Sequence, residues 1–307
     1  MSAALVATAL AGAGACTFPS YVEDQNAAAG QGGASAAGGA TGGASGSSSG
    51  NAGTGAGASS SGEGGGGGEA GGATPDPGIV LGWSDGSLDQ LGFALLGSAR
   101  VLADGVEITN KDVKKTIGGV AYEQQLDLTL EPELEVIVGF RITPGAMNGD
   151  GLAIMLHASP DGFTRLGSGG GGLGYGSIAP CVAVELDTAE IAAADLPAPH
   201  LGLMPDCNPN MHGPSTTALG GDPSDGGDWT LEARWSGKTG LLEVTLRSEA
   251  TGRATSLNEP MDLPALVGPK LYAVVTAANG EFSATHFVHS LSLGGGGQPR
   301  RTLRNEP

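Results

Sequence analysis

The chain has 307 residues, of which 57 are glycine, and a formal net charge of −18 at pH 7. This acidity argues against a nucleic-acid ligand, since proteins that bind the phosphate backbone present clustered Lys and Arg, and it equally disfavours adhesion to anionic lipid. The length admits one large all-β domain or two smaller domains.

The first fifteen residues, MSAALVATALAGAGA, form a short run of small and apolar residues that is followed by Cys16. Such a run is too short to cross a bilayer as a helix and is typical of an export signal. Residues 13–16, AGAC, resemble a bacterial lipobox, in which the cysteine becomes the lipidated N-terminus. We therefore expect a lipoprotein-type signal over 1–16 and an exported protein whose only membrane contact is a lipid anchor at the cell envelope or outer surface. An ordinary signal peptide with Cys16 incidental is the alternative.

Residues 17–77 are expected to form a disordered tether. From residue 25 onward this segment consists of Gly, Ala and Ser with scattered acids, and it lacks Lys and Arg. Such a composition cannot bury enough apolar surface to offset its conformational entropy. The tail over 296–307 is also expected to be disordered, which leaves 78–295 as the folded domain.

Helical periodicity is almost absent between residues 78 and 295, where apolar residues instead alternate with polar ones, as in strands with one buried face. Continuous apolar runs at 152–156 and 271–275 indicate central strands. Glycine-rich turns separate these segments without a βαβ rhythm, which favours an all-β sandwich or barrel. The alternating sets are Leu126, Leu128 and Leu130; Leu134, Val136, Val138, Phe140 and Ile142; and Leu242, Val244 and Leu246.

Segment 181–207 carries the most informative polar residues. Alternate residues of a strand share a face, so Glu185 and Asp187 are expected to project together. A second strand at 200–204, paired antiparallel with the first, would bring His200 near Asp187, and Asp195 lies on the loop between the two strands. Carboxylates and an imidazole that converge would repel one another or lose solvation unless a cation held them. Spacing alone leaves two interpretations open, a metal site and a solvated acidic face with a surface histidine.

The same pairing of strands would bring Cys207 close to Cys181. With Cys16 assigned to the lipid anchor, these two cysteines form an even pair in an exported domain, where disulfides persist. We therefore predict a disulfide between them.

The stretch VAVELDT, followed by an aspartate and by HLG, resembles the metal-binding stretch of legume lectins. The resemblance implies a concanavalin-like antiparallel β-sandwich (jelly roll) that binds carbohydrate through a site organised by Ca²⁺ and by Mn²⁺ or another transition ion. In the family the glutamate, both aspartates and the histidine hold the metals. Those roles would fall on Glu185, Asp187, Asp195 and His200.

Further family landmarks occur in the expected order. GDGLAIML resembles the strand whose aspartate accepts hydrogen bonds from sugar hydroxyls after a cis peptide, which here implies Asp150 and the Gly149–Asp150 bond. GGGLGYG resembles the loop whose backbone N–H donates to the sugar, a role for Gly171. ANGEF, residues 278–282, resembles the specificity loop and implies carbohydrate contacts for Gly280 and Glu281.

One departure concerns the segment between the two metal aspartates, where the family has an asparagine that binds Ca²⁺ and the sugar. This sequence has TAEIAAA there, so Glu190 is a candidate cation ligand instead. Phe282 and Tyr175 are candidates for the aromatic residue that stacks on the sugar. The departure also leaves open a lectin fold used only for protein contact.

An enzyme is the sharpest alternative, because Glu185, Asp187 and Glu190 fit the E-x-D-x-x-E pattern of a β-glucanase family with a similar sandwich. There two glutamates act as nucleophile and acid. That pattern leaves Asp150 and His200 unexplained, so we favour a non-enzymatic lectin that binds a glycan or polysaccharide. The sequence leaves oligomerisation open. His286 and His289 are expected to be packing or surface residues, and Trp229 and Trp235 are expected in the core.

Overall fold

The computed structural model describes residues 79–189, 196–211 and 213–305, which lie in one compact unit, Glu69–Pro307. The expected signal with Cys16 and the whole of the expected tether lie outside the described residues, as do Glu190 and Asp195. Within the described part of the chain, no helix has both the length and the apolar character needed to cross a membrane.

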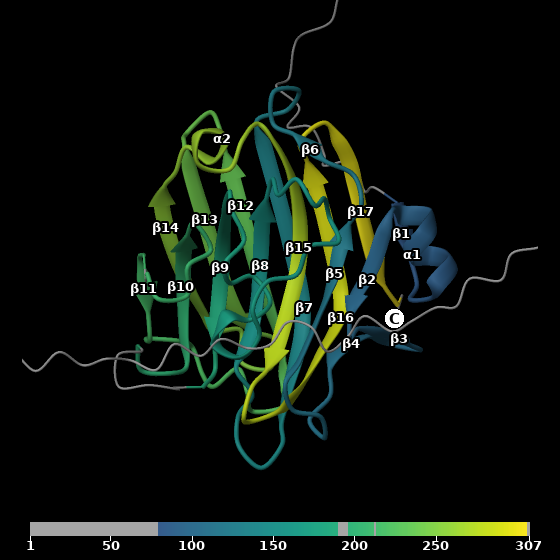
Figure 1. Ribbon diagram of the computed structural model, residues 1–307, viewed down its shortest axis with the longest axis vertical. Coiled ribbons are helices and arrows are strands. Elements are labelled where there is room, and N and C mark those ends of the chain that lie inside the picture. Colours follow the sequence, from purple (N-terminus) through teal and green to yellow (C-terminus); the bar gives the residue numbers. More distant parts are fainter. Residues whose placement is uncertain (1–78, 190–195, 212, 306–307) are drawn as a thin grey trace, which may run out of the picture. The chain divides into compact units, whose positions relative to one another are not determined.

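Two β-sheets stack as layers, with their strands running in similar directions (Figure 1). The larger sheet has nine strands in the order β1-β17-β16-β7-β12-β13-β14, with β4 pairing with β16 and with β3. The pairing of β1 with β17 is parallel, and the others are antiparallel. Its strands are β1 (Ile79–Leu81), β3 (Arg100–Leu102), β4 (Gly105–Thr109), β7 (Glu133–Pro144), β12 (Asp228–Ser236), β13 (Leu241–Ser248), β14 (Ala254–Pro260), β16 (Ala284–Gly295) and β17 (Gln298–Arg304).

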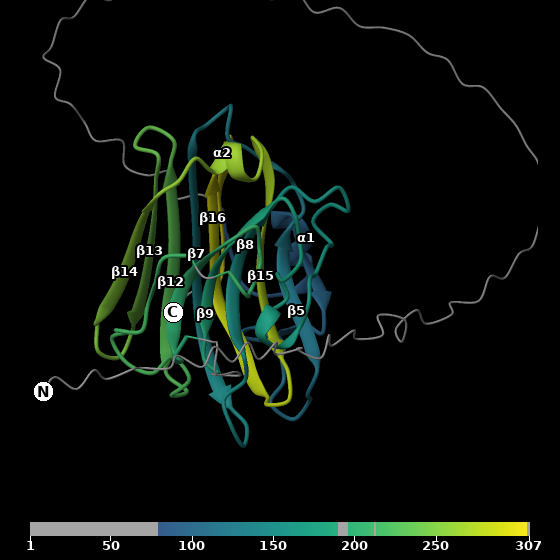
Figure 2. The ribbon, with the colours of Figure 1, turned by 60° about the vertical axis from the view of Figure 1, so that its left-hand side comes forward.

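The second sheet has eight strands in the order β11-β10-β9-β8-β15-β5-β2, with β6 pairing with β15. Figure 2 shows β12, β13 and β14 as a layer separate from β8, β15 and β5. Its strands are β2 (Phe93–Gly97), β5 (Thr116–Tyr122), β6 (Leu126–Asp127), β8 (Gly151–His157), β9 (Cys181–Asp187), β10 (His200–Pro205), β11 (Ser215–Thr216) and β15 (Lys270–Asn279).

The main core fills the space between the two sheets, and it is built by the alternation that the sequence predicts. Every second residue of β7, from Leu134 to Ile142, is buried in this core. The same holds for Leu242, Val244 and Leu246 of β13. Trp229 and Trp235 belong to it as well. The predicted all-β sandwich is confirmed.

The structure departs from the sequence prediction at two short helices, α1 (Asp85–Leu91) and α2 (Leu263–Leu266). Helix α1 is bounded by local signals: the Ser84 side chain accepts a hydrogen bond from the Ser87 N–H, and Gly92 ends the helix at φ 73°. Too few residues are involved for a helical period to stand out. The strand predicted around Leu126 is also shorter than expected, because the chain turns after Asp127 and leaves Leu130 exposed.

The expected disordered tail is wrong at its centre, because residues 298–304 form strand β17. This strand lies between β16 and β1 in the larger sheet. Its basic sequence, QPRRTLR, has a single apolar side chain, Leu303, which is fully buried in the main core. One buried leucine among charged residues is too weak a pattern to predict a strand.

Substituting Leu303 tests whether β17 belongs to the folded domain. Leu303→Ala should lower the free energy of unfolding by about 2–4 kcal/mol, because it removes a fully buried side chain. Arg304→Ala, at the exposed neighbouring position, is the matched control and should change it by less than about 0.5 kcal/mol. Urea unfolding of the two variants measures both values. Equal effects would show that the tail does not pack.

His286 of β16 is fully buried, which lowers the pKa of its imidazole to about 3. The Thr109 hydroxyl donates to the Ala284 carbonyl at 3.0 Å and lies 2.7 Å from His286 Nδ1. Since that hydroxyl has only one proton, His286 Nδ1–H must be the donor to it. Protonation would therefore place a charge on Nε2, which has no hydrogen-bond partner within the described residues.

Stability is consequently expected to fall as the pH drops below the unfolded-state histidine pKa of about 6.5. Between about pH 6.5 and pH 3 the histidine is protonated in the unfolded chain and neutral in the folded chain. Over this range each unit of falling pH lowers the free energy of unfolding by up to about 1.4 kcal/mol for this residue. His286→Asn retains an N–H donor near Thr109 and cannot protonate. Urea unfolding between pH 7 and pH 4 should show a shallower decline for this variant, and parallel declines would contradict the assignment.

Candidate functional site

The candidate site lies at one end of the eight-stranded sheet, where the strand register brings separate strand ends together. Gly151, the first residue of β8, pairs with Asp187, the last residue of β9. Asp187 pairs on its other side with His200, the first residue of β10. Ala278, near the end of β15, pairs with Gly151. This end of the sandwich is opposite α2 (Figure 1).

Strand β9 sorts its residues between two hydrophobic clusters. Val182, Val184 and Leu186 face the main core between the sheets. Cys181 and Ala183, on the other face, belong to a second cluster that includes residues of the loop 163–178, among them Tyr175. That loop therefore covers the outer face of the eight-stranded sheet. Glu185 and Asp187 continue the outer face and are buried, which confirms that they project together and excludes the solvated acidic face.

Glu185, Asp187 and His200 converge as the sequence predicts. One potential ligand atom from each residue lies within 4.8 Å of the others. Glu185 Oε1 is 3.2 Å from His200 Nε2, and Glu185 Oε2 accepts a hydrogen bond from the Tyr175 hydroxyl. Asp187 Oδ1 accepts a hydrogen bond of 2.8 Å from the Ala189 N–H.

The donor set of this cluster fits a transition-metal ion. Two carboxylates buried together lose solvation and repel each other, and a cation offsets both costs. Mixed carboxylate and imidazole ligands suit Mn²⁺ and similar ions. The other predicted metal residues, Glu190 and Asp195, lie outside the described residues.

The predicted disulfide between Cys181 and Cys207 is confirmed, with a Cα–Cα distance of 5.4 Å. Cys181 is the first residue of β9, and Cys207 follows β10 by two residues. The bond therefore closes the hairpin at the end opposite His200 and Asp187. It holds the register that brings Glu185, Asp187 and His200 together.

Asp150 immediately precedes β8 and is 2% exposed. Burial raises the pKa of its carboxyl to about 6, although a hydrogen bond from the Gly280 backbone acts in the opposite direction. Its Oδ2 has no hydrogen-bond partner among the described residues. A buried acceptor without a donor is costly, so this oxygen is suited to a ligand that supplies a hydroxyl or a positive charge.

The peptide bond between Gly149 and Asp150 is trans, so the implied cis bond is wrong. The chain turns instead at Gly151, whose φ of 141° is unfavourable for other residues. A Cβ at Gly151 would lie 2.2 Å from the Leu186 carbonyl oxygen. This close approach to β9 directs the Asp150 carboxylate toward Gly280 without a cis peptide.

The glycine loop and the specificity loop meet at the Asp150 carboxylate. A Cβ on Gly280 would lie 3.0 Å from Asp150 Oδ2 and 3.2 Å from the Gly170 Cα. Gly171 follows Gly170 in the short 3₁₀ helix η1 (Gly170–Gly172). The absence of a side chain at Gly280 therefore lets Gly170, the residue before Gly171, approach the Asp150 carboxylate across it.

The other predicted sugar-contacting residues divide into two groups. Glu281 and Phe282 are exposed beside Gly280, and the Glu281 carboxylate pairs with Lys115 at 3.0 Å. Tyr175 is fully buried and its hydroxyl donates to Glu185. The prediction that its ring could stack on a sugar is therefore wrong. Its neighbours on both sides are glycines, and the main chain folds inward there and carries the ring beneath the loop.

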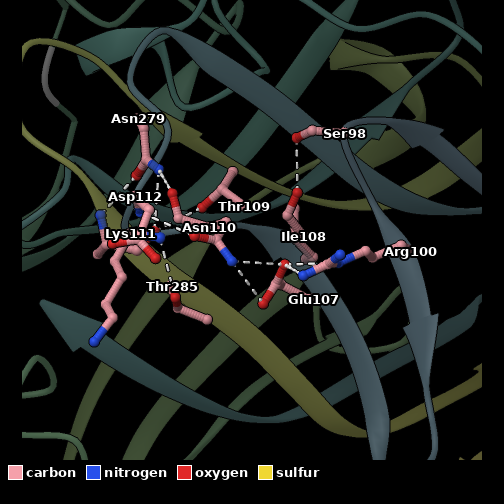
Figure 3. Close-up of polar contacts among 11 residues, drawn as sticks. Ser98, Arg100, Glu107, Ile108, Thr109, Asn110, Lys111, Asp112, Asn279 and Thr285 are labelled. Atoms are coloured by element: carbon pink, nitrogen blue, oxygen red, sulfur yellow. Dashed lines mark hydrogen bonds and ion pairs between the residues drawn. The ribbon is translucent and has the colours of Figure 1, made fainter. Parts of the chain in front are cut away.

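Asn279 is a structural residue that sequence reasoning missed. Its side-chain N–H groups lie 3.0 Å from three carbonyl oxygens, those of Asn110, Val113 and Ala284. Its side-chain oxygen accepts from the Ala284 N–H at 3.0 Å. Figure 3 shows Asn279 beside Asn110 and the segment that follows it. The asparagine within ANGEF was a signal for a tight turn, but its partners are remote in sequence.

A two-sheet antiparallel sandwich with a buried carboxylate–imidazole cluster at one end is a concanavalin-like architecture. The chain matches the legume lectin domain over residues 86–306, and it therefore belongs to the legume lectin family. This match extends through β17, and family members bind carbohydrate.

Solved structures of legume lectins share the fold. Peanut lectin, determined with a 9mer peptide, has 18% sequence identity and a TM-score of 0.59, with 69% of this chain and 93% of that chain covered. The metal-free form of lectin I-B4 from Griffonia simplicifolia has 20% identity and a TM-score of 0.58, covering 66% and 92%. Basic winged bean lectin with Tn-antigen has 22% identity and a TM-score of 0.57, covering 66% and 91%.

Chelation is expected to lower the melting temperature of the wild-type domain, and Ca²⁺ with Mn²⁺ should restore it. An ion that binds only the folded state at 100 times its Kd adds about 2.7 kcal/mol, which corresponds to a shift of several degrees. Differential scanning fluorimetry with and without chelator measures the shift. Glu185→Gln, which removes one charged ligand and keeps the shape, should melt at nearly the same temperature in both conditions. A wild-type melt indifferent to chelator would contradict a metal site.

Proposed function

We propose that this domain binds a glycan at the end of the sandwich where Asp150, Gly171 and Gly280 meet. The observation that carries the proposal is the Asp150 carboxylate, which is buried beside Gly280 and has an oxygen without a hydrogen-bond partner among the described residues. Sugar hydroxyls would supply the missing donors, and bonds to a charged acceptor are stronger than neutral ones. The Gly171 N–H would donate to the same sugar, and Glu281 would line its edge.

In this proposal Ca²⁺ and a transition ion such as Mn²⁺ hold the adjacent loop in its binding conformation. Glu185, Asp187 and His200 would ligate them, since the three residues converge and are buried. Asp195 and Glu190 would complete the sites. When bound, the ions supply positive charge that neutralises the buried carboxylates.

The solved relatives support a carbohydrate ligand. The structure of basic winged bean lectin contains Tn-antigen, and that of the Bauhinia forficata lectin is a complex with GalNAc. At these identities the likeness shows the fold alone, so the sugar bound by this chain is a separate question. The membership of the family favours a binding protein over the β-glucanase alternative.

The geometry of Glu185 adds to that preference. A glycosidase nucleophile or acid must reach the substrate, whereas the two oxygens of this carboxylate face His200 and Tyr175. The residue is 1% exposed, beneath the loop that covers the sheet. Its surroundings suit a metal ligand rather than a catalytic carboxylate.

We further propose that the domain acts outside the cell, tethered by lipid at Cys16 to the envelope or outer surface. The support is the lipobox-like sequence and the glycine-rich segment that follows it. The disulfide Cys181–Cys207 is consistent with export. Self-association stays open in this proposal.

Asp150→Asn should abolish detectable glycan binding and leave the fold intact. The substitution keeps the shape but replaces one acceptor oxygen with a donor, and the expected loss is about 2–3 kcal/mol, or roughly 30-fold to 150-fold in Kd. Folding should survive because the variant removes a buried charge. A glycan array with Ca²⁺ and Mn²⁺ identifies a ligand, and calorimetry then compares the two proteins on it.

Three outcomes would contradict this proposal in different ways. Equal affinity of wild type and Asp150→Asn would refute the assignment of Asp150. Failure of the metal-loaded wild type to bind any member of a broad array would favour a lectin fold that serves protein contact. A reducing-sugar assay on β-glucans should show no release of reducing ends, and release that depends on Glu190 would reinstate the enzyme.

A further inference from the structure

The lysines of this acidic chain are concentrated in one short segment. Five lysines occur in the sequence, and Lys111, Lys114 and Lys115 lie within five consecutive residues. The net charge of the chain is −18, so this segment, together with its one acid, Asp112, is a local exception. We call residues 110–116 the lysine loop; it connects β4 with β5.

The lysine loop is hydrogen-bonded to the specificity loop and to the residues that follow it, at several points. Asn279 donates to the carbonyl groups of Asn110 and Val113. The Lys111 N–H donates to the Thr285 hydroxyl at 3.0 Å, and its carbonyl accepts from Ser283. Figure 3 shows the Lys111 side chain leading away from these backbone contacts. The anchored backbone fixes where the ammonium groups emerge.

Lys115 connects this loop directly to the Asp150 site. Its N–H donates to the Gly280 carbonyl at 3.2 Å, and the Gly280 N–H donates to the Asp150 carboxylate. One residue therefore separates the lysine from the proposed sugar-binding carboxylate. Lys115 also has a φ of 54°, a left-handed conformation that residues with a side chain rarely adopt. The surrounding hydrogen bonds hold it there.

The ammonium groups of the loop face solvent. Lys111 and Lys114 are exposed and have no carboxylate within ion-pair distance among the described residues. Lys115 pairs with Glu281, and both side chains are more than half exposed, at 53% and 70%. An exposed ion pair of this kind is weak because water and salt screen it, so a ligand anion can compete with Glu281 for Lys115.

A group bound at the lysine loop is influenced mainly by the charges close to it and less by the net charge of the chain. At physiological salt the screening length is about 8 Å, so most of the carboxylates that give the chain its acidity do not act on a group bound at the lysine loop. An anion in direct contact with one ammonium lies well within this length and is attracted to it.

We propose that the lysine loop selects an acidic glycan, whose carboxylate or sulfate group binds Lys114 and Lys115 while a neighbouring ring occupies the Asp150 site. This inference rests on the proposed function, and it names the class of ligand. Glu281 competes for Lys115 in the absence of ligand. The lysine loop then determines the preference between charged and neutral glycans, whereas Asp150 is required for binding of either kind.

Matched oligosaccharides test this selection. Lactose, sialyllactose and sulfated lactose share a neutral core, and oligogalacturonate can be compared with its methyl ester. Wild type with Ca²⁺ and Mn²⁺ should bind an acidic member at least about tenfold more tightly than its neutral counterpart. The carboxylate and sulfate probes distinguish the two sources of charge. Lys114→Gln with Lys115→Gln should reduce the preference to below about threefold.

A double variant elsewhere is the matched control. Lys238→Gln with Lys270→Gln removes the same charge from lysines paired with Glu133 and Asp127, away from the lysine loop, and should keep the wild-type preference. Glu281→Gln should act in the opposite sense and tighten binding of the acidic probe, because it removes a carboxylate that competes with the probe for Lys115. Agreement of these three results supports the proposal.

Different results would contradict selection by the lysine loop and glycan binding at Asp150. Equal binding of acidic and neutral probes, or the same loss in both double variants, overturns the lysine loop as a selector while leaving glycan binding in place. An acidic probe that binds Asp150→Asn as tightly as wild type shows only surface adhesion and overturns both. Failure of every acidic probe also overturns the selection.

Discussion

The site depends on one arrangement, the burial of the Glu185 carboxylate on the outer face of β9. A carboxylate can be held there because Tyr175 and His200 each engage one of its oxygens. Tyr175 comes from the loop that covers the sheet, and His200 begins the neighbouring strand. Through these contacts the Glu185 carboxylate joins the loop 163–178, β9 and β10. The disulfide at the far end of the hairpin keeps these partners in register.

Asp150 and Asn279 show two different uses of a buried polar side chain. Asn279 has its donors and its acceptor satisfied by backbone groups, so it serves to join the loops on either side of the sheet edge. Asp150 is left with an unsatisfied oxygen. A buried polar atom without a hydrogen-bond partner destabilises the folded state, and such atoms cluster at functional sites. Asn279 therefore serves the structure, and Asp150 has the oxygen that the proposed function assigns to a ligand.

Much of the fold and part of the site followed from the sequence because they rest on local periodicity. The alternation in β7 and β13 marks one face as buried, and the two-residue spacing of Glu185 and Asp187 places them together. The hairpin with His200 and the Cys181–Cys207 pair required only antiparallel pairing. What escaped prediction depends on remote partners. Strand β17 has one buried leucine, Asn279 bonds to carbonyls far away in the chain, and Tyr175 is drawn inward by a loop whose path no local pattern records.

The parallel pairing of β1 with β17 has a consequence for how the domain can be used. Ile79 lies opposite Arg301, and Leu81 opposite Leu303, so the two ends of the folded region lie side by side on one sheet. Because the two strands run in the same direction, a linker from the end of β17 to the start of β1 must run back along the pair and cannot be a tight turn. New termini can then be opened at the exposed turn between β13 and β14. The same geometry allows the whole sandwich to be inserted into a loop of a host protein as a self-contained cassette. The constraint on such rearrangements is that β17 must stay between β1 and β16.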